Sequence, residues 1–342
     1  MRYLWVDQTR LIAAFAVISI HAFSSLYHSF DTAASSDWWF ANFVVTFGKS
    51  IANPIYAMLS GYLLLGRDIQ AVPFIKTHMS RFAPALVFWS IFYAGFSMIF
   101  FEATFKDFIW QVSLGFLLTG KAYFHLWYLS TFIIMLLFAP FINQWIKGKV
   151  PTRNDIFILF SIVAGLFFMN SLSGLKGEFT ESGFNWYTGF AWYLAYFILG
   201  YFIGQEKITQ RIPAGWLIGV FIFTFLICFI GNYLAASQGV VKDNLVVSNT
   251  GIFGFVLAVC AFSLFSKLSS GRVSSPGFQT IAATAFGIYL IHPAVLYFAQ
   301  KISQSLISHR IPQTLVAVLV TYIVCILIVY VFRKTAIGRR LT

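Results

Sequence analysis

The chain has 342 residues, of which 59% are hydrophobic, 20% aromatic and only 10% charged. These values lie far from those of soluble globular domains and indicate an integral membrane protein. The formal net charge of +12 does not indicate a nucleic-acid partner, because the basic residues form short clusters between apolar runs rather than one stripe. Cys228, Cys260 and Cys325 lie within apolar runs without metal-ligand spacing, so we expect packing residues and no metal site.

Apolar runs separated by polar breaks predict an all-α, polytopic membrane protein with about ten transmembrane helices. Most of the 23 Lys and Arg residues fall on the side of the N-terminus, which places both termini in the cytoplasm. We expect one membrane-embedded domain over residues 1–342. The predicted spans are about 4–27, 43–65, 82–101, 124–145, 155–172, 187–205, 213–235, 249–267, 280–299 and 312–332.

The first predicted span carries Arg10 and His21, eleven residues apart. Eleven residues of an α-helix bring two side chains to within about 20° on one face, with a rise of about 16 Å. Asp7 is the nearest candidate to neutralise Arg10. A cation can hold a phosphate-bearing donor and an imidazole can act as a general base, so this face suits either group transfer across the membrane or a proton relay.

Structural roles alone could also explain both Arg10 and His21. Arg10 lies close enough to the cytoplasmic edge for its long side chain to reach the headgroups, and a neutral His21 can simply bond to a neighbouring helix. Ionisable groups inside a span are nevertheless costly, and each one is a candidate functional residue.

The second predicted span adds Lys49, Asn53-Pro54 and Ser60-Gly61. A proline inside a helix frees a backbone carbonyl, which membrane proteins tolerate where a cavity or a partner satisfies it. Lys49 is expected near the outer end of the span, where it either snorkels or meets a substrate. For Ser60-Gly61 a close helix-packing contact is the favoured interpretation.

Lys76, His78 and Arg81 follow the second span on the expected cytoplasmic side. Clustered cations would form a phosphate-binding surface, and ordinary positive-inside charge explains them equally well. The sequence contains no Walker loop and no dinucleotide-binding glycine motif, so nucleotide hydrolysis is not expected.

Several candidate acceptor-binding residues lie in segments expected at the outer surface. His125 precedes the fourth span, and Glu181 and Trp186 lie before the sixth. An open groove there would hold a polar acceptor, although tryptophans at such positions are commonly interfacial anchors. Segment 103–122 mixes regularly spaced apolar residues with charged ones, which predicts an amphipathic helix lying on the outer surface.

An ordered set of stretches resembles the membrane acyltransferase type 3 family. The set comprises Arg10 and His21 in the first span, "NPIYAMLSGYLL", "FHLWYL", "WYLAYFILGYFIG" and "AFGIYLIHP". The set covers essentially the whole chain. In its length the chain looks most like the short members of the family, which O-acetylate bacterial surface glycans such as enterobacterial common antigen. The resemblance implies a multi-pass protein of the bacterial inner membrane that moves acetyl from cytoplasmic acetyl-CoA to a sugar hydroxyl on the far side. The acetyl-CoA is a substrate, and no permanently bound cofactor is expected.

The resemblance also assigns roles to individual residues. His21 matches the essential histidine of the family and Arg10 its paired basic residue, so both are the predicted catalytic residues. Arg10, Lys76, His78 and Arg81 are the predicted donor-binding residues; many members have two arginines where this chain has His78 and Arg81, and Lys76 is the candidate to compensate. The predicted acceptor-binding residues are Lys49, His125, Glu181 and Trp186, and the predicted oxyanion or structural residues are Asn53, Ser60, Tyr289 and His292.

Two other functions remain open from the sequence. Asp7, Arg10, His21 and Lys49 would also serve a proton-coupled transporter or flippase for a glycan or lipid precursor, although no internal repeat supports inverted halves. An acyl-CoA-dependent enzyme acting on a small molecule or peptide is a third possibility. Direct attack of the acceptor and a route through an acyl-histidine are both compatible with the residues.

Overall fold

The computed structural model describes residues 3–29, 35–113, 123–148, 186–237, 251–267 and 271–342, together with Thr152, Asn154 and Ile158. These residues form α-helices joined by loops, with an isolated antiparallel bridge between Tyr3 and Val273. The predicted all-α fold is therefore confirmed. The chain divides into two compact units, one containing residues 1–59, 202–340 and 342, the other residues 60–201 and 341.

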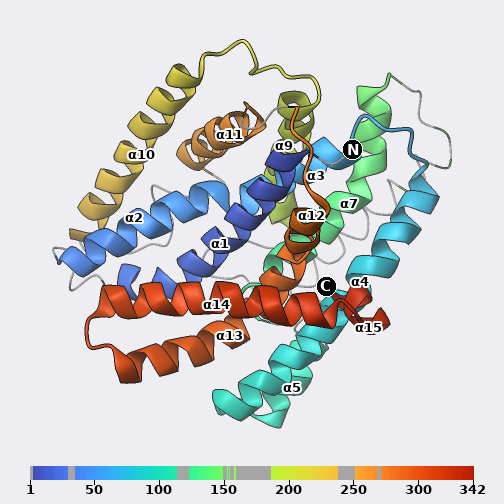
Figure 1. Cartoon of the computed structure of the whole chain (residues 1–342). Helices are drawn as coiled ribbons and strands as arrows, with labels where there is room; N and C mark the ends of the chain where they lie inside the picture. The colour runs from blue at the N-terminus through green and yellow to red at the C-terminus, as the bar shows by residue number, and fades with distance from the viewer. Residues whose placement is uncertain are drawn as a thin grey trace. The chain divides into compact units, whose positions relative to one another are not determined.

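The first unit is built around α1 (Leu4–Tyr27), which packs against α2, α11, α12, α13 and α14. In Figure 1, α13 and α14 run antiparallel and are joined by a short connection at residues 307–309. The helices of this unit besides α1 and the start of α3 are α2 (Ser36–Ile51), α10 (Ala214–Ser237), α11 (Ile252–Lys267), α12 (Pro276–Ala282), α13 (Ala285–Leu306), α14 (Arg310–Phe332) and α15 (Ala336–Leu341).

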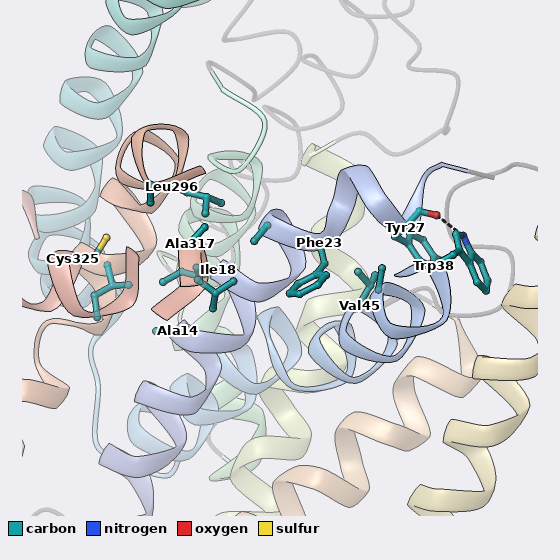
Figure 2. Packing of buried hydrophobic residues seen from close by; sticks show 14 of the residues in the cluster. Ala14, Ile18, Phe23, Tyr27, Trp38, Val45, Leu296, Ala317 and Cys325 are labelled. Atoms are coloured by element: carbon teal, nitrogen blue, oxygen red, sulfur yellow. Dashed lines mark hydrogen bonds between the residues drawn. The ribbon is translucent and has the colours of Figure 1, made fainter. Parts of the chain in front are cut away.

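Small side chains let α1 and α2 approach closely. A Cβ added at Gly48 would lie 2.7 Å from Cγ1 of Ile20, so only glycine fits there without a shift of that side chain. Near the other end of the contact, Trp38 donates a 3.0 Å hydrogen bond from Nε1 to the carbonyl oxygen of Tyr27 (Figure 2). Because lipid is as apolar as the core, such close packing and internal hydrogen bonds are what hold helices together in a membrane.

Five helices of the described residues are long and apolar enough to cross a bilayer: α1, α4, α7, α10 and α14. The pair α12 and α13, bent by 46°, would form a sixth span. The protein is therefore a multi-pass membrane protein. The total of ten spans and the cytoplasmic termini stay predictions, and the predicted span at 155–172 lies outside the described helices.

The second predicted span differs from the structure. It was expected over 43–65 as one helix, and it forms α2 followed by α3 (Asn53–Leu64), with a break at Ala52, where ψ is −102°. Pro54 has no N–H and its ring would clash with the carbonyl of Ser50, so an uninterrupted helix is disfavoured. Because α2 begins at Ser36, Lys49 lies about 20 Å along this helix rather than near its outer end.

The second unit contains α4 (Ala71–Phe100), α5 (Phe105–Val112), α7 (Trp127–Ile146) and parts of α3 and α9 (Trp186–Gly204). Helix α4 begins eleven residues before the predicted start of the third span. Proline is tolerated in a first helical turn, where backbone N–H groups have no helical partner, so Pro73 is compatible with a helix that begins at Ala71.

Asn143 joins α7 to the loop between α3 and α4. Its side chain accepts a hydrogen bond from Gly66 N at 2.8 Å and donates one to Arg67 O at 2.6 Å.

Helix α5 lies within the segment predicted to be amphipathic. Thr104 and Asp107 form a reciprocal capping box at its start. The hydrogen bonds from Thr104 to the carboxylate hold the pKa of Asp107 below its ordinary value. Phe105 and Ile109 are 67% and 46% exposed, as expected of a helix at an interface.

Gly61 supports a test of the packing between α3 and α9. A Cβ at this position would lie 1.7 Å from the carbonyl oxygen of Phe197, and backbone cannot yield cheaply. We expect Gly61→Ala to destabilise the protein by roughly 1–3 kcal/mol and to lower the midpoint of thermal unfolding, followed in detergent by size-exclusion chromatography. Gly95→Ala is the control, because its Cβ meets nothing within 4 Å; equal midpoints for the two variants would contradict the analysis.

Candidate functional site

The N-terminal half of α1 carries an ion pair inside the first unit. Arg10 Nη1 lies 3.7 Å from Oδ1 of Asp7, whose side chain is fully buried, whereas that of Arg10 is 27% exposed. This confirms Asp7 as the predicted partner. The adjoining backbone is held as well: Tyr56 donates from its hydroxyl to Arg10 O at 3.1 Å, and Tyr322 to Leu11 O at 3.2 Å. Arg10 therefore has a defined position and retains an exposed edge for an anion.

His21 stacks on the imidazole of His292 from α13. The ring centroids are 5.3 Å apart and the planes are inclined by 25°. His21 is half-buried, whereas His292 is fully buried. The structure thus brings together two predicted site residues separated by most of the chain.

Pro293 explains how His292 is oriented. In a regular helix the N–H of residue 293 would bond to the carbonyl of Tyr289, but proline has no N–H. Nδ1 of His292 takes that place, 2.8 Å from Tyr289 O and 3.3 Å from Ile288 O. Since a carbonyl oxygen only accepts, Nδ1 carries the hydrogen, and in the neutral imidazole Nε2 then keeps the lone pair. The His-Pro pair therefore fixes both the orientation and the tautomer of the ring.

Lys49 of α2 contacts the C-terminal end of α1. Its Nζ lies 5.4 Å from the centre of the Tyr27 ring, a cation–π contact. The preceding residue, Gly48, packs against Ile20, the neighbour of His21 in sequence. The ammonium group of Lys49 is thus held at the C-terminal end of α1, at Tyr27. Its predicted role in acceptor binding stays a prediction.

The other predicted support residues lie in different places. Tyr289 is buried, with its ring 6.3 Å from that of His292, and Asn53 begins α3 immediately after the break at Ala52. Ser60 belongs to the second unit, where its neighbour Gly61 forms the close contact expected of this pair. Any role of these side chains at an oxyanion stays a prediction.

The predicted donor-binding residues Lys76, His78 and Arg81 lie on α4 in the second unit. Lys76 and Arg81 are exposed, and Nδ1 of the half-buried His78 lies 2.8 Å from Phe74 O. On an α-helix His78 and Arg81 lie about 60° apart, whereas Lys76 lies about 140° or more from either. Lys76 therefore points to a different side of the helix from the pair that it was expected to support.

The predicted acceptor-binding residues of the second unit are only partly described. His125 is 2% exposed and packs edge-on against Tyr93, with ring centroids 4.9 Å apart, rather than lining an open surface. Glu181 lies outside the described residues. Trp186 begins α9, and its side chain is likewise outside them. Binding of an acceptor by these three stays a prediction.

A buried polar cluster joins α2 to α10 and was not singled out in the sequence. Asn232 donates to Asn42 Oδ1 at 3.0 Å and lies 3.1 Å from the Thr46 hydroxyl, while Asn42 donates to Phe229 O at 2.9 Å. Amides within apolar runs are the signal that would have found it, because they require partners in a membrane.

Comparison with protein families identifies the class of protein. A model described as an acyltransferase domain, that of the acyltransferase type 3 family, matches residues 3–330. The chain belongs to this family and is a membrane acyltransferase with an acyl donor and an acceptor as substrates. Neither the comparison with curated proteins nor that with solved structures finds a match. Arg10, His21 and His292 all lie within the matched range.

The geometry of His292 leads to a test of its positioning role. His292→Ala removes the ring that stacks on His21, and we expect kcat for acyl transfer to fall at least about tenfold, with KM for both substrates little changed. Asn at this position retains an N–H for the Tyr289 carbonyl, so His292→Asn should keep the fold and still lose rate. A normal kcat in a folded His292→Asn protein would show that the imidazole is not required.

Proposed function

We propose that this chain is an O-acetyltransferase of the bacterial inner membrane that moves acetyl from cytoplasmic acetyl-CoA to a hydroxyl of a surface polysaccharide or lipid-linked glycan. One arrangement carries the proposal: a single helix of a membrane acyltransferase bears a partly exposed guanidinium and, about 16 Å farther along, an imidazole stacked on a second one. Family membership favours acyl transfer over the transporter or flippase reading of the same residues.

His21 supplies the base in this proposal. It accepts the proton of the acceptor hydroxyl while that oxygen attacks the thioester carbonyl. A C–O bond forms, the C–S bond breaks, and the departing thiolate receives the proton, which leaves an acetyl ester and free CoA. His292 holds the His21 ring through the stack, and His292 is itself held by the Tyr289 carbonyl.

Arg10 supplies donor binding in this proposal. Its planar guanidinium presents several N–H groups to phosphate oxygens, and Asp7 keeps it in place. The ammonium of Lys49, which lies 5.4 Å from the Tyr27 ring on α1, is the group that we assign to stabilising negative charge developing on the thioester oxygen. Lys76, His78 and Arg81 on α4 stay the predicted donor-binding residues of the second unit.

Loss of His21 tests the chemistry. Membranes containing His21→Ala should transfer radiolabelled acetyl from acetyl-CoA to extracted glycan about 10²–10⁴-fold more slowly than wild type, the usual contribution of a general base. His28→Ala is the control, because His28 is an exposed histidine at the end of the same helix. Equal labelling by His21→Ala, at matched expression, would remove His21 from the mechanism.

The same assay separates the alternatives. A flippase would change the sidedness of the glycan without adding mass, whereas an acetyltransferase adds the label. Label retained on the protein when no glycan is present, and absent in His21→Ala, would identify the acyl-histidine route. Label transferred only with glycan present would identify direct attack.

Arg10→Lys tests donor binding separately from acceptor binding. Lysine keeps the charge beside Asp7 but loses the planar fork, so KM for acetyl-CoA should rise about tenfold while KM for the glycan stays unchanged. Arg272→Lys is the matched control at an exposed arginine of the first unit. An unchanged KM for acetyl-CoA in Arg10→Lys would place donor binding elsewhere.

A further inference from the structure

A polar pocket of about 260 Å³ opens at the end of the first unit opposite Arg10. Its walls come from the C-terminal ends of α1 and α13 and the start of α14. Leu26 is the apolar member of a lining that otherwise consists of hydroxyl, amide and guanidinium groups. In a chain that is 59% hydrophobic, this gathering of polar side chains distinguishes the pocket from its surroundings.

The pocket lies on the continuation of the helices that carry the two stacked histidines. Ser25 of the lining follows His21 by four residues, a rise of about 6 Å along α1, and Ser29 lies just beyond the end of this helix. Gln300 of the lining follows His292 by eight residues and donates to Ala22 O at 3.3 Å, which joins α13 to α1 next to His21 in sequence. The lining on α1 therefore begins at Ser25, about one helical turn beyond His21.

The lining suits a molecule rich in hydroxyl groups. Serine and threonine hydroxyls and glutamine amides each both donate and accept hydrogen bonds, as the hydroxyls of a sugar do. Ser29, Ser303 and Thr314 donate to nearby backbone carbonyls, which leaves the lone pairs of their oxygens able to accept hydrogen bonds. The volume is just below the roughly 300–1,000 Å³ of small-ligand sites, a size for one sugar unit rather than for a whole nucleotide donor.

The charge in the pocket is positive. Arg310 lines it, is exposed, and no carboxylate is among the lining residues. Arg310 is also the first residue of α14, where the helix dipole already favours anions and disfavours a cation. The guanidinium therefore does not serve the stability of its helix, and together with the N-terminus it creates a site that favours a negative group.

We propose that this pocket binds the acceptor, and that it selects a sugar unit carrying an anionic group, a carboxylate or a phosphate, that contacts Arg310. The inference rests on the proposed function, since it places the acceptor on the side of His21 away from Arg10. The hydroxyl and amide groups hold the sugar, and Arg310 orients it by its charge.

Binding is measured first, without acyl donor, so that it does not depend on catalysis. Purified full-length protein in detergent is titrated with glucuronate, glucose 1-phosphate and glucose, and binding is followed by saturation-transfer NMR. At least one of the two anionic sugars should bind about tenfold more tightly than glucose, as a hydrogen bond to a charged group provides. Tighter binding of glucuronate would identify a carboxylate as the anion, and tighter binding of glucose 1-phosphate a phosphate.

Variants then locate the preference. Arg310→Gln should abolish the tighter binding of the anionic sugars relative to glucose, and Arg310→Lys, which keeps the charge, should retain part of this difference in affinity. Lys301→Gln removes another exposed cation, which lies 4.6 Å from the ring of Tyr297 and does not line the pocket, and should change nothing. Equal binding of glucose and both anions, or an unchanged preference in folded Arg310→Gln, would overturn the proposal.

Acetyl transfer separates this inference from the proposed function. With extracted glycan, Arg310→Gln should raise KM for the glycan about tenfold and leave KM for acetyl-CoA and kcat unchanged. Wild-type transfer that is abolished in His21→Ala but unaffected in Arg310→Gln would retain the acetyltransferase and reject the acceptor pocket. Anion binding that depends on Arg310, without any acetyl transfer by wild type, would retain the pocket and reject the proposed reaction.

Discussion

Inside a bilayer a polar group has no water to bond, so another part of the chain must satisfy it. The arrangement around α1 depends on this constraint. Pro293 leaves the carbonyl of Tyr289 without its helical partner, and His292 supplies the hydrogen instead, which presents its ring to His21. The cost of an unsatisfied carbonyl in an apolar environment is several kcal/mol. Because of that cost, the His292 ring is restricted to the orientation in which Nδ1 bonds to the Tyr289 carbonyl.

The same constraint explains how the helices of the first unit are joined. Hydroxyls of Tyr56 and Tyr322 bond to backbone carbonyls of α1, and Asn42 and Asn232 bond to each other between α2 and α10. Apolar contact alone does not distinguish a neighbouring helix from lipid, whereas these bonds require one particular neighbour. They keep the ionisable groups of α1 in a rigid frame, as a site for group transfer requires.

An acyltransferase that works across a membrane has to separate its two substrates while bringing their reacting atoms together. Along α1 the first unit places a guanidinium, an imidazole and a polar pocket in that order. In the proposed reaction, the charged donor and the polyol acceptor would approach the same imidazole from opposite ends of this helix. Placing these groups on a helix rather than on loops preserves their spacing, because the rise per residue is constant.

The sequence by itself determined the all-α membrane fold and the shared face of Arg10 and His21, because hydrophobic run length and helical period are local properties. The family followed from the resemblance of an ordered set of stretches along the chain. Asp7 as the partner of Arg10 followed from the same local spacing. Tertiary structure alone decided that His292 stacks on His21 and that residues far apart in sequence line one pocket. These outcomes depend on which helices pack together, and that choice is made by contacts that no single segment contains.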